Sequence, residues 1–446
     1  MAPVGRRWRF VFPVLVGLVC APEAFAQQPP QSGARAFETF ASFIERTRRA
    51  TIGQFRERAE TQVRDGEAFE DMKAHVLKLY DGVTVKHSFA DDAHFVDCVP
   101  RNQQPGVRSG ARVSERPTRP ATPPKTERPS KPPGTARTLD LTLRRGKKDT
   151  YGNEQYCPAG TIPMRRVTLD EIVRFPTLRD FLRGDKIDDG SLDDKRRQDL
   201  PGDSSSHYYA RGAQFVDNLG GASWLNVWSP TVSSHRMSLS QIWVVGGEGE
   251  SKQTVEGGWQ VYPDKWGTDK AALFIFYTTK GYQDGCYNLD CTAFVQTANN
   301  VYLGKGFTNY SSNGGTQWVF RLQWKRNTDG NWWLFYQGPG NYIPVGYYPK
   351  SLFGTGQMAS KANKIAFGGE DTGKPSAKQM GSGNKAADGW QKAAFQNRAF
   401  YIDTGGTSRW ADLTKYEPDP TCYTATINNI FGSWGTYLYF GGPSCN

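Results

Sequence analysis

Tryptophan is concentrated in one part of this 446-residue chain, because 12 of its 13 tryptophans lie beyond residue 204. In that region short runs of alternating apolar and polar residues are separated by glycines and by Asp or Asn turns. Alternation with a period of two is typical of β-strands, and many short strands indicate a mainly β fold, an antiparallel β-sandwich of jelly-roll type. Strands are expected at Ala222–Val227, Ser240–Val245, Thr254–Tyr262, Ala271–Thr278, Gln317–Lys325, Trp332–Gln337 and Lys364–Glu370.

Turn signals agree with this interpretation. The segment Arg326–Asn331 contains an Asp-Gly pair between two aromatic runs and predicts a hairpin. The 48 glycines and the aromatic fraction of 13% also fit a β-rich fold with many tight turns. The sequence contains no Gly-rich phosphate loop and no alternation of helices with strands.

The first 26 residues read as a signal peptide. Arg6, Arg7 and Arg9 precede a short apolar stretch, and Ala24-Phe25-Ala26 forms a small-residue cleavage site. A membrane-spanning helix would need about 20 apolar residues, which is longer than this stretch. The leader therefore predicts export, with the mature protein secreted, extracellular or periplasmic, and no membrane span.

Composition divides the rest of the chain into two short modules, a Pro-rich segment between them and a β-rich domain. Apolar residues at helical spacing between residues 36 and 80 predict amphipathic helices, and another helix is expected at Leu169–Leu182. Residues 101–138 hold eight prolines among basic and hydroxyl residues, a composition that predicts disorder. The expected units are the signal peptide (1–26), a helical segment (27–100), a Pro/Arg-rich disordered linker (101–150), a second short module with a cleavable stretch (151–203), and a β-sandwich (204–446).

The formal net charge of +11 resides in two of these segments. Residues 101–150 contain 13 Lys and Arg against 4 Asp and Glu, and the leader contains three arginines against one glutamate. Since the remaining residues are neutral in sum, a folded nucleic-acid-binding surface receives little support and no nucleic-acid partner is expected.

Six cysteines remain after the leader, and an even number in an exported chain favours disulfides. Sequence proximity pairs Cys286 with Cys291 and Cys422 with Cys445, which leaves Cys98 for Cys157. A zinc site is the alternative, but the chain has five histidines and no paired C-x-x-C spacing, so no metal is expected.

Carboxylates are the best candidates for chemistry in the β region. It holds only two histidines, and neither a G-x-S-x-G elbow nor an H-E-x-x-H motif occurs. Most acidic residues lie in turn-like contexts, whereas Glu256 and Glu370 lie on expected strands beside glycines. Glycines next to a strand carboxylate leave space above a sheet for a peptide or sugar chain. The alternative, in which both are exposed strand residues paired with lysines, is equally consistent with the residue types.

Several motifs resemble one known family. They are TVEGGWQVYP, GCYNLDCTAFVQT, GNWWL, GYYPKSLF, FGGE, QMGSG and YFGGPSC, preceded by FEDMKAHVLKLY, FVDCVP and YCPAGTIPMRRVT. In this order they resemble the neprosin family of glutamic peptidases, from about residue 68 to the C-terminus without the Pro-rich insert. The earlier pieces are similar to that family's activation peptide, which implies that residues 27–100 and 151–203 are two parts of a propeptide and that residues 204–446 are the catalytic β-sandwich. Gly257 and Phe367 depart from the residues common in the family.

The resemblance implies a secreted zymogen that hydrolyses peptide bonds in protein or peptide substrates with no cofactor. Glu256 and Glu370 match the family's catalytic glutamates, and the family suggests cleavage next to proline. Two adjacent carboxylates do not ionise together easily, so at acid pH one serves as general acid and the other as general base. The propeptide is then the enzyme's own intramolecular inhibitor.

Four further residues are candidates for contacts with the oxyanion or the substrate: Gln260, Tyr262, Gln379 and Trp259. Each is more often a structural residue at such positions. Two other functions stay open at this point. A jelly-roll glycoside hydrolase also uses two carboxylates, and a non-catalytic carbohydrate-binding protein uses aromatic side chains alone.

Overall fold

The fold is that of a computed structural model, which describes residues 36–446 except 92–93, 115–116, 118, 126–132, 185, 187–206, 373–378 and 444–446. From Glu38 onward the chain forms one unit by its internal contacts. Its helices are α1 (Phe40–Arg49), α2 (Gly66–Leu79), α3 (Pro105–Arg108), α4 (Leu169–Ile172), α5 (Leu178–Arg183) and α6 (Pro263–Trp266). None of the helices in the described part of the chain is long and apolar enough to cross a membrane.

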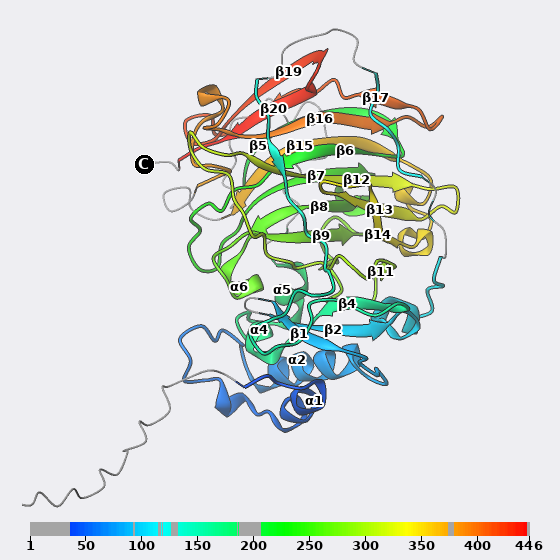
Figure 1. The fold of residues 1–446 in the computed structure, drawn as a ribbon, viewed down its shortest axis with the longest axis vertical. Coiled ribbons are helices and arrows are strands. Elements are labelled where there is room, and N and C mark those ends of the chain that lie inside the picture. The colour runs from blue at the N-terminus through cyan, green and yellow to red at the C-terminus, as the bar shows by residue number, and fades with distance from the viewer. Residues whose placement is uncertain are drawn as a thin grey trace, which may run out of the picture. The chain divides into compact units, whose positions relative to one another are not determined.

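Two antiparallel sheets form the β domain, as the alternation predicts (Figure 1). The seven-stranded sheet has the order β10-β9-β8-β7-β15-β5-β18. Its strands are β5 (His207–Asn218), β7 (Ser238–Gly246), β8 (Gln253–Val261), β9 (Ala272–Thr278), β10 (Cys286–Tyr287), β15 (Ala362–Thr372) and β18 (Thr414–Tyr416).

The ten-stranded sheet has the order β11-β14-β13-β12-β6-β16-β20-β19, with β17 paired to β16 and β3 to β12. Its strands are β3 (Arg137–Thr138), β6 (Gly220–Asn226), β11 (Val295–Gln296), β12 (Trp318–Arg326), β13 (Trp332–Gln337), β14 (Ile343–Tyr348), β16 (Ala394–Ile402), β17 (Ser408–Trp410), β19 (Thr424–Gly432) and β20 (Gly435–Gly441). The expected hairpin joins β12 to β13, and Gly330 in its turn has a positive φ of 85°. The mainly β sandwich is therefore confirmed.

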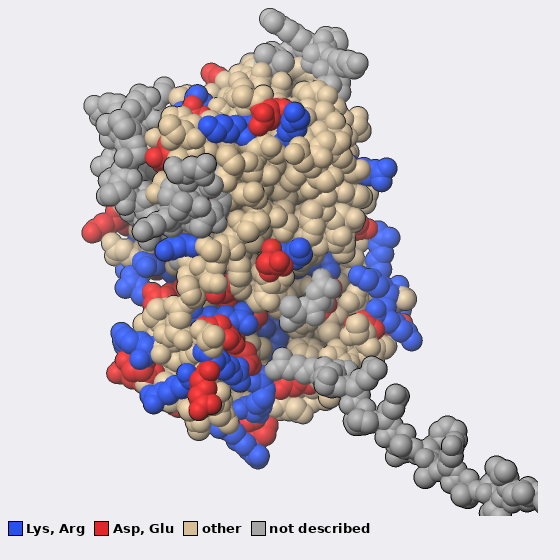
Figure 2. All heavy atoms as spheres, turned by 90° about the vertical axis from the view of Figure 1, so that its left-hand side faces the viewer, with Lys and Arg blue, Asp and Glu red and all other residues tan. Residues whose placement is uncertain are grey.

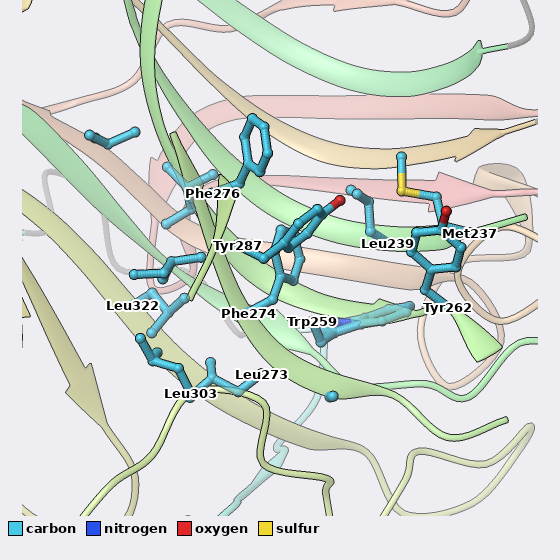
Figure 3. Close-up of a cluster of buried hydrophobic side chains, with 14 of the residues drawn as sticks. Met237, Leu239, Trp259, Tyr262, Leu273, Phe274, Phe276, Tyr287, Leu303 and Leu322 are labelled. Carbon is cyan, nitrogen blue, oxygen red and sulfur yellow. The ribbon is translucent and has the colours of Figure 1, made fainter. Parts of the chain in front are cut away.

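Large apolar side chains fill the space between the two sheets. Figure 3 shows part of this core, in which Trp259 and Leu273 of the seven-stranded sheet lie near Leu322 of the ten-stranded sheet. All three side chains are fully buried. Each stabilises the fold by roughly 1.5–3 kcal/mol through the burial of apolar surface. The core fixes the sheets, so side chains on their outer faces are held on rigid supports.

A mixed module precedes the β domain and consists of α1, α2, α4, α5 and a small sheet. That sheet has the order β1-β2-β4, with β1 at Ser88–Asp91, β2 at His94–Pro100 and β4 at Thr161–Arg165. The segment 27–100, expected to be helical, is thus not helical throughout its described part, since two strands follow α2. The helix expected at Leu169–Leu182 is wrong in its centre, because Pro176 separates α4 from α5 and Thr177 caps the second helix.

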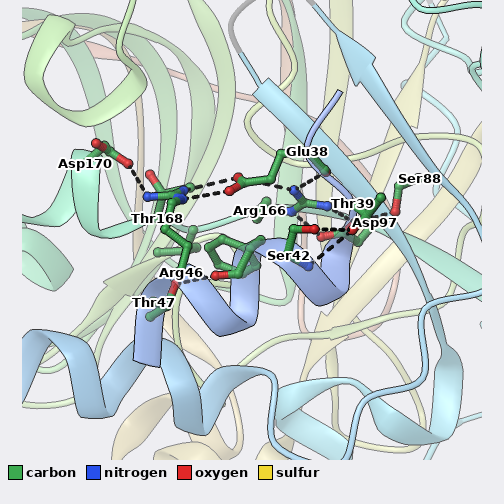
Figure 4. Close-up of polar contacts among 12 residues, drawn as sticks. Glu38, Thr39, Ser42, Arg46, Thr47, Ser88, Asp97, Arg166, Thr168 and Asp170 are labelled. Atoms are coloured by element: carbon green, nitrogen blue, oxygen red, sulfur yellow. Dashed lines mark hydrogen bonds and ion pairs between the residues drawn. The ribbon is translucent and has the colours of Figure 1, made fainter. Parts of the chain in front are cut away.

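An ion pair holds helix α1 to the small sheet (Figure 4). Arg166 donates two hydrogen bonds to Asp97, at 2.7 and 2.8 Å, and both side chains are completely buried. Arg166 also donates to the backbone oxygen of Glu38 at the start of α1. Charged side chains are dense over this module and sparse over the β domain, on the face that Figure 2 shows.

Buried charges also join the module to the β domain. Lys265 forms an ion pair with Asp290 at 2.8 Å and donates to the backbone oxygen of Phe181 in α5. His75 of α2 bonds to the backbone oxygen of Asp290, and Arg165 of β4 lies 3.6 Å from its carboxylate. Such pairs need both partners, so the module and the β domain depend on each other for these contacts.

The described parts of residues 101–150 differ from the disordered linker that their composition predicts. They include α3 and β3, and they run along the outer face of the ten-stranded sheet as the cyan trace of Figure 1. Ala121, for example, exchanges two hydrogen bonds with the side chain of Gln323. A Pro-rich segment cannot form its own hydrophobic core. The folded sheet supplies it with hydrogen-bond partners and with apolar surface to pack against.

Disulfides join Cys98 to Cys157 and Cys286 to Cys291, as expected. The first lies within the mixed module and the second follows β9. Cys445 lies outside the described residues, so its pairing with Cys422 stays a prediction. The leader and most of the expected cleavage stretch also lie outside them.

Candidate active site

Glu256 and Glu370 project from the same face of the seven-stranded sheet. Glu256 lies on β8 and Glu370 on β15, with β7 between them. The register pairs Glu256 with Trp243 of β7 and Glu370 with Leu239 of β7. Because Leu239 and Trp243 are four residues apart on one strand, they share a face, and so do the two glutamates.

One set of paired residues on β8, β7 and β15 lies between the two carboxylates. In this set Gln241 of β7 pairs with Gly258 of β8 on one side and with Gly368 of β15 on the other. A Cβ atom at Gly258 would lie 1.9 Å from the backbone oxygen of Ser240, so no larger residue fits there without a shift of the strands. The glycines therefore allow neighbouring strands to approach closely, and the expected space for a peptide or sugar chain stays a prediction.

Three donors surround the carboxylate of Glu256, which is completely buried. Gln241 donates its amide at 2.8 Å, Tyr282 its hydroxyl at 2.6 Å and Thr254 its hydroxyl at 2.9 Å. Burial raises the pKa of Tyr282 well above its ordinary value, and the charge of Glu256 adds to this, so the hydroxyl remains a donor. The other amide atom of Gln241, Oε1, is buried and has no hydrogen-bond partner among the described residues.

A lysine from the segment after α5 joins the two glutamates. The ammonium of Lys186 lies 3.1 Å from Oε2 of Glu256 and 2.9 Å from Oε2 of Glu370. His207, at the start of β5, contacts Oε1 of Glu370 through Nδ1 at 2.8 Å. All four side chains are buried, and Lys186 is only 2% exposed.

The charges of this cluster depend on one another. Burial alone would raise the pKa of Glu370, but Lys186 and His207 outweigh it and lower this pKa to about 2. Burial would likewise lower the pKa of Lys186, yet Glu256 and Glu370 outweigh it and raise that pKa. Lys186 therefore stays charged, and its ammonium contacts both carboxylates.

The other four sequence candidates lie at different distances from this cluster. Gln260 shares the face of Glu256 and donates to the hydroxyl of Tyr287 at 3.1 Å. Tyr262 follows β8 and lines a cavity of about 330 Å³ next to α5. Trp259 points into the core and donates to the backbone oxygen of Asn226, which does not support contact with a substrate. The side-chain oxygen of Gln379 accepts a hydrogen bond from the backbone nitrogen of Thr231, and no contact of Gln379 with either glutamate is found among the described residues.

Sequence reasoning missed Lys186, Gln241, Tyr282 and His207. Lys186 lies in a charged stretch that reads as a solvated loop, and no pattern separates it from its neighbours. Gln241 could have been noticed as a polar residue within an expected strand. The pairing of that strand with the strand of Glu256, which brings the two side chains together, cannot be read from the sequence.

Residues 234–443 match the neprosin family model, a range that includes both glutamates. Among solved structures, the chain is similar to a scytalido-glutamic peptidase with a transition-state analogue inhibitor, at 9% identity and a TM-score of 0.31. It is also similar to SCP-B, an eqolisin-family peptidase in complex with the tripeptide Ala-Ile-His, at 9% identity and a TM-score of 0.29. Each match covers 53% of this chain and 98% of the other. Similarity this low assigns no function.

Proposed function

The chain belongs to the neprosin family of glutamic peptidases through its domain at residues 234–443, and from this we propose an exported two-glutamate endopeptidase that is made as a zymogen. One observation carries the proposal: a single buried ammonium from the segment before the β domain bridges Glu256 and Glu370. Two buried carboxylates on a rigid sheet form an acid–base pair, and Lys186 occupies the position between them. The disulfides agree with export.

In the proposed mechanism, Lys186 leaves and a water takes its place, since an ammonium and a water molecule are similar in size. Glu256 and Glu370 then share one proton, because two neighbouring negative charges disfavour ionisation of both carboxylates. The ionised glutamate removes a proton from the water as it attacks the peptide carbonyl carbon. The protonated glutamate donates to the carbonyl oxygen, and the proton taken from the water passes to the leaving nitrogen as the C–N bond breaks. One hydroxyl of the intermediate returns its proton to a glutamate as the C=O of the new carboxyl group forms, so the pair again holds one proton. No covalent intermediate is required.

Gln241 and Tyr282 are the groups that orient Glu256 in this scheme. Their donors reach the carboxylate from β7 and from the loop before Cys286, where the backbone nitrogen of Tyr282 also donates to the hydroxyl of Thr278. The Oε1 atom of Gln241 has no hydrogen-bond partner among the described residues. Gln241 lies between the two glutamates on β7, where a backbone N–H of an extended substrate can donate to this atom.

Release from latency follows from the position of Lys186 in the chain. A cut anywhere in residues 187–206 separates Lys186 from the β domain, which begins at His207. We place the autolytic cut within the Arg183 to Asp203 stretch, with the large fragment starting near Ser204. A preference for proline in the substrate is part of the proposal and follows from the family.

The test incubates the acid-treated protein with a denatured protein and, separately, with a polysaccharide. New amino termini in the protein sample are expected, with proline enriched next to the cut sites by mass spectrometry. Reducing ends from the polysaccharide without peptide cleavage would instead indicate a glycoside hydrolase. Polysaccharide binding without either reaction would indicate a carbohydrate-binding protein.

A further inference from the structure

The two glutamates of the candidate site differ in the groups that surround them. Glu256 accepts hydrogen bonds from three neutral side chains, those of Gln241, Thr254 and Tyr282. Glu370 instead contacts the imidazole of His207, whose Nδ1 lies 2.8 Å from Oε1 of the carboxylate. Lys186 touches both glutamates at similar distances, and in the proposed mechanism it leaves before catalysis. His207 therefore continues to distinguish Glu370 from Glu256.

The fold holds the ring of His207 against Glu370. His207 begins β5, and the register pairs it with Thr372 of β15, two residues after Glu370. Since alternate residues of a strand share a face, the side chains of His207 and Glu370 lie on the same face of the seven-stranded sheet. The ring of His207 stacks on that of Tyr209, with 6.3 Å between the ring centroids and 23° between the planes. The side chain of His207 is 1% exposed and that of Glu370 is 3% exposed.

A charged imidazole favours one form of the carboxyl group that it faces. A histidine with a proton on each ring nitrogen has two donors and no acceptor, and this is its usual form in acid solution. A carboxyl group at Nδ1 must then accept, which favours its ionised form. Burial raises the pKa of Glu370, but Lys186 and His207 outweigh it and lower this pKa to about 2. The part that His207 contributes remains once Lys186 has left.

The partners of Glu256 are compatible with its protonated form. A hydroxyl both donates and accepts, so Thr254 and Tyr282 can pair with either form of the carboxyl group. The amide of Gln241 donates through its nitrogen, while its Oε1 has no hydrogen-bond partner among the described residues. A half-turn of this amide brings Oε1 to Glu256 as an acceptor for the carboxyl proton. The proton that the pair shares is therefore better placed on Glu256 than on Glu370.

We propose that His207 is a positioning residue that keeps Glu370 ionised, so that Glu370 is the general base and Glu256 the general acid. This inference rests on the proposed two-glutamate peptidase. Glu370 takes a proton from the attacking water while Glu256 gives its proton to the carbonyl oxygen. Glu370 passes its proton to the leaving nitrogen as the C–N bond breaks, and one hydroxyl of the intermediate returns a proton to Glu256 as the new C=O forms. The cycle ends with Glu370 ionised and Glu256 protonated, as it began.

The charged and titratable groups that face Glu370 and His207 come from several elements of the described chain. They are Lys186 after α5, Glu256 of β8, Tyr282 in the loop before Cys286, Tyr209 and Arg211 of β5, and Tyr416 of β18. The guanidinium of Arg211 lies over the rings of Tyr209 and Tyr416, at 4.8 and 4.6 Å from their centroids. Arg211 is kept in every chain tested, so the effect of His207 is measured against a constant background.

The first test needs no catalysis. It uses the uncut full chain with Lys186→Met, in which either Glu256 or Glu370 is also replaced by glutamine, so that one carboxyl group of the pair remains. NMR of glutamate labelled with carbon-13 at the side-chain carboxyl follows the titration of that group. The titration midpoint of Glu370 should lie at least about one pH unit below that of Glu256. Equal midpoints, or the reverse order, would overturn the proposal.

Replacement of His207 assigns the difference between the midpoints to this residue. In His207→Asn the side-chain amide lies near the position of Nδ1, so a donor is kept while the charge is lost. The difference should then largely disappear, and its persistence would overturn the proposal. The matched control is His235→Asn, which should leave the difference unchanged. Nδ1 of His235 lies 2.8 Å from Asp264, and asparagine tolerates the positive φ of 62° at this position.

The second test compares the wild-type chain with His207→Asn, each cut in trans by a tagged wild-type enzyme that is then removed. The dependence of kcat/KM on pH reports the base on its acid limb and the acid on its alkaline limb. In His207→Asn the acid limb should move up by about one to three pH units. An unchanged profile, or movement of the alkaline limb instead, would overturn the proposal. Absence of peptide hydrolysis by the wild-type chain would contradict the proposed function, whereas the NMR titration would still decide whether His207 keeps Glu370 ionised.

Discussion

Lys186 is the residue whose removal tests latency. In Lys186→Met the methylene stem is kept, but the ammonium between Glu256 and Glu370 is lost and the carboxylates repel each other. The closed state should weaken, so the lag before hydrolysis of a short fluorogenic peptide by the intact chain in acid should shorten at least about tenfold. Lys270→Met is the control, since Lys270 is exposed in a loop. A lag identical to that of the wild type would show that Lys186 does not maintain latency.

Gln241 should affect catalysis rather than latency. In Gln241→Leu one donor to Glu256 is lost while the volume is nearly kept. The expected result is a fall in kcat of about a hundredfold to a thousandfold with a smaller change in KM, as for other groups that stabilise charge in a site. The matched control is Gln214→Leu on β5, whose amide oxygen accepts from Asp412. A change in KM alone would assign Gln241 to substrate binding only.

The two glutamates could be predicted from the sequence, whereas the residues around them could not. Glu256 and Glu370 each lie on a strand beside glycines, and this local pattern survives in the fold. Lys186 acts from a position 70 residues before Glu256, in a stretch with no periodicity. Contacts of that kind depend on the path of the chain, which alternation and turn signals do not encode.

Among the elements, helix α1 and strand β2 depend on the buried pair of Asp97 and Arg166. Asp97→Asn leaves the guanidinium of Arg166 without its main counter-charge, and such losses cost about 3–5 kcal/mol. Thermal unfolding should show an earlier transition for the mixed module. Asp71→Asn, at an exposed position of α2, is the control. An unchanged transition in Asp97→Asn would mean that the pair contributes little to the module.

Seven strands of the β domain were predictable because their alternation is a local property of the sequence, whereas β5, β14, β16, β19 and β20 were not expected. The seven expected runs lie within two residues of β6, β7, β8, β9, β12, β13 and β15. Pro176 breaks the expected helix at Leu169–Leu182, a signal that the apolar spacing obscured. The contacts of Ala121 and Lys125 were not predictable, because they are made with Gln323 and Trp410 on a distant part of the chain.

For the whole molecule, acid should open the site. The pKa of Glu370 is lowered from its ordinary value of 4.5 to about 2 in the closed state. A lowered pKa means that the ionised form stabilises the closed state above pH 4.5, and that this stabilisation is lost as the pH falls from 4.5 towards 2. This stabilisation of the closed state amounts to roughly 3 kcal/mol. It depends on the groups that face Glu370, namely Lys186, His207, Glu256 and Tyr282.

The rate of the first cleavage of the intact chain should therefore rise as the pH falls through this window. Gel electrophoresis over time at a series of pH values, with N-terminal sequencing of the large fragment, measures the rate and the cut site. A first cleavage that is as fast at neutral pH as at pH 3 would contradict acid release.

Hydrolysis by the glutamate variants tests the central claim most directly. Each of Glu256→Gln and Glu370→Gln is first cut in trans by a tagged wild-type enzyme, which is then removed, so that a failure to mature is not mistaken for a loss of catalysis. Glutamine keeps the shape of glutamate but neither takes nor gives the catalytic proton. The rate of peptide hydrolysis at acid pH should fall about a hundredfold to ten-thousandfold in both variants, with the fold intact by circular dichroism. Full activity in either correctly folded variant would contradict the two-glutamate mechanism.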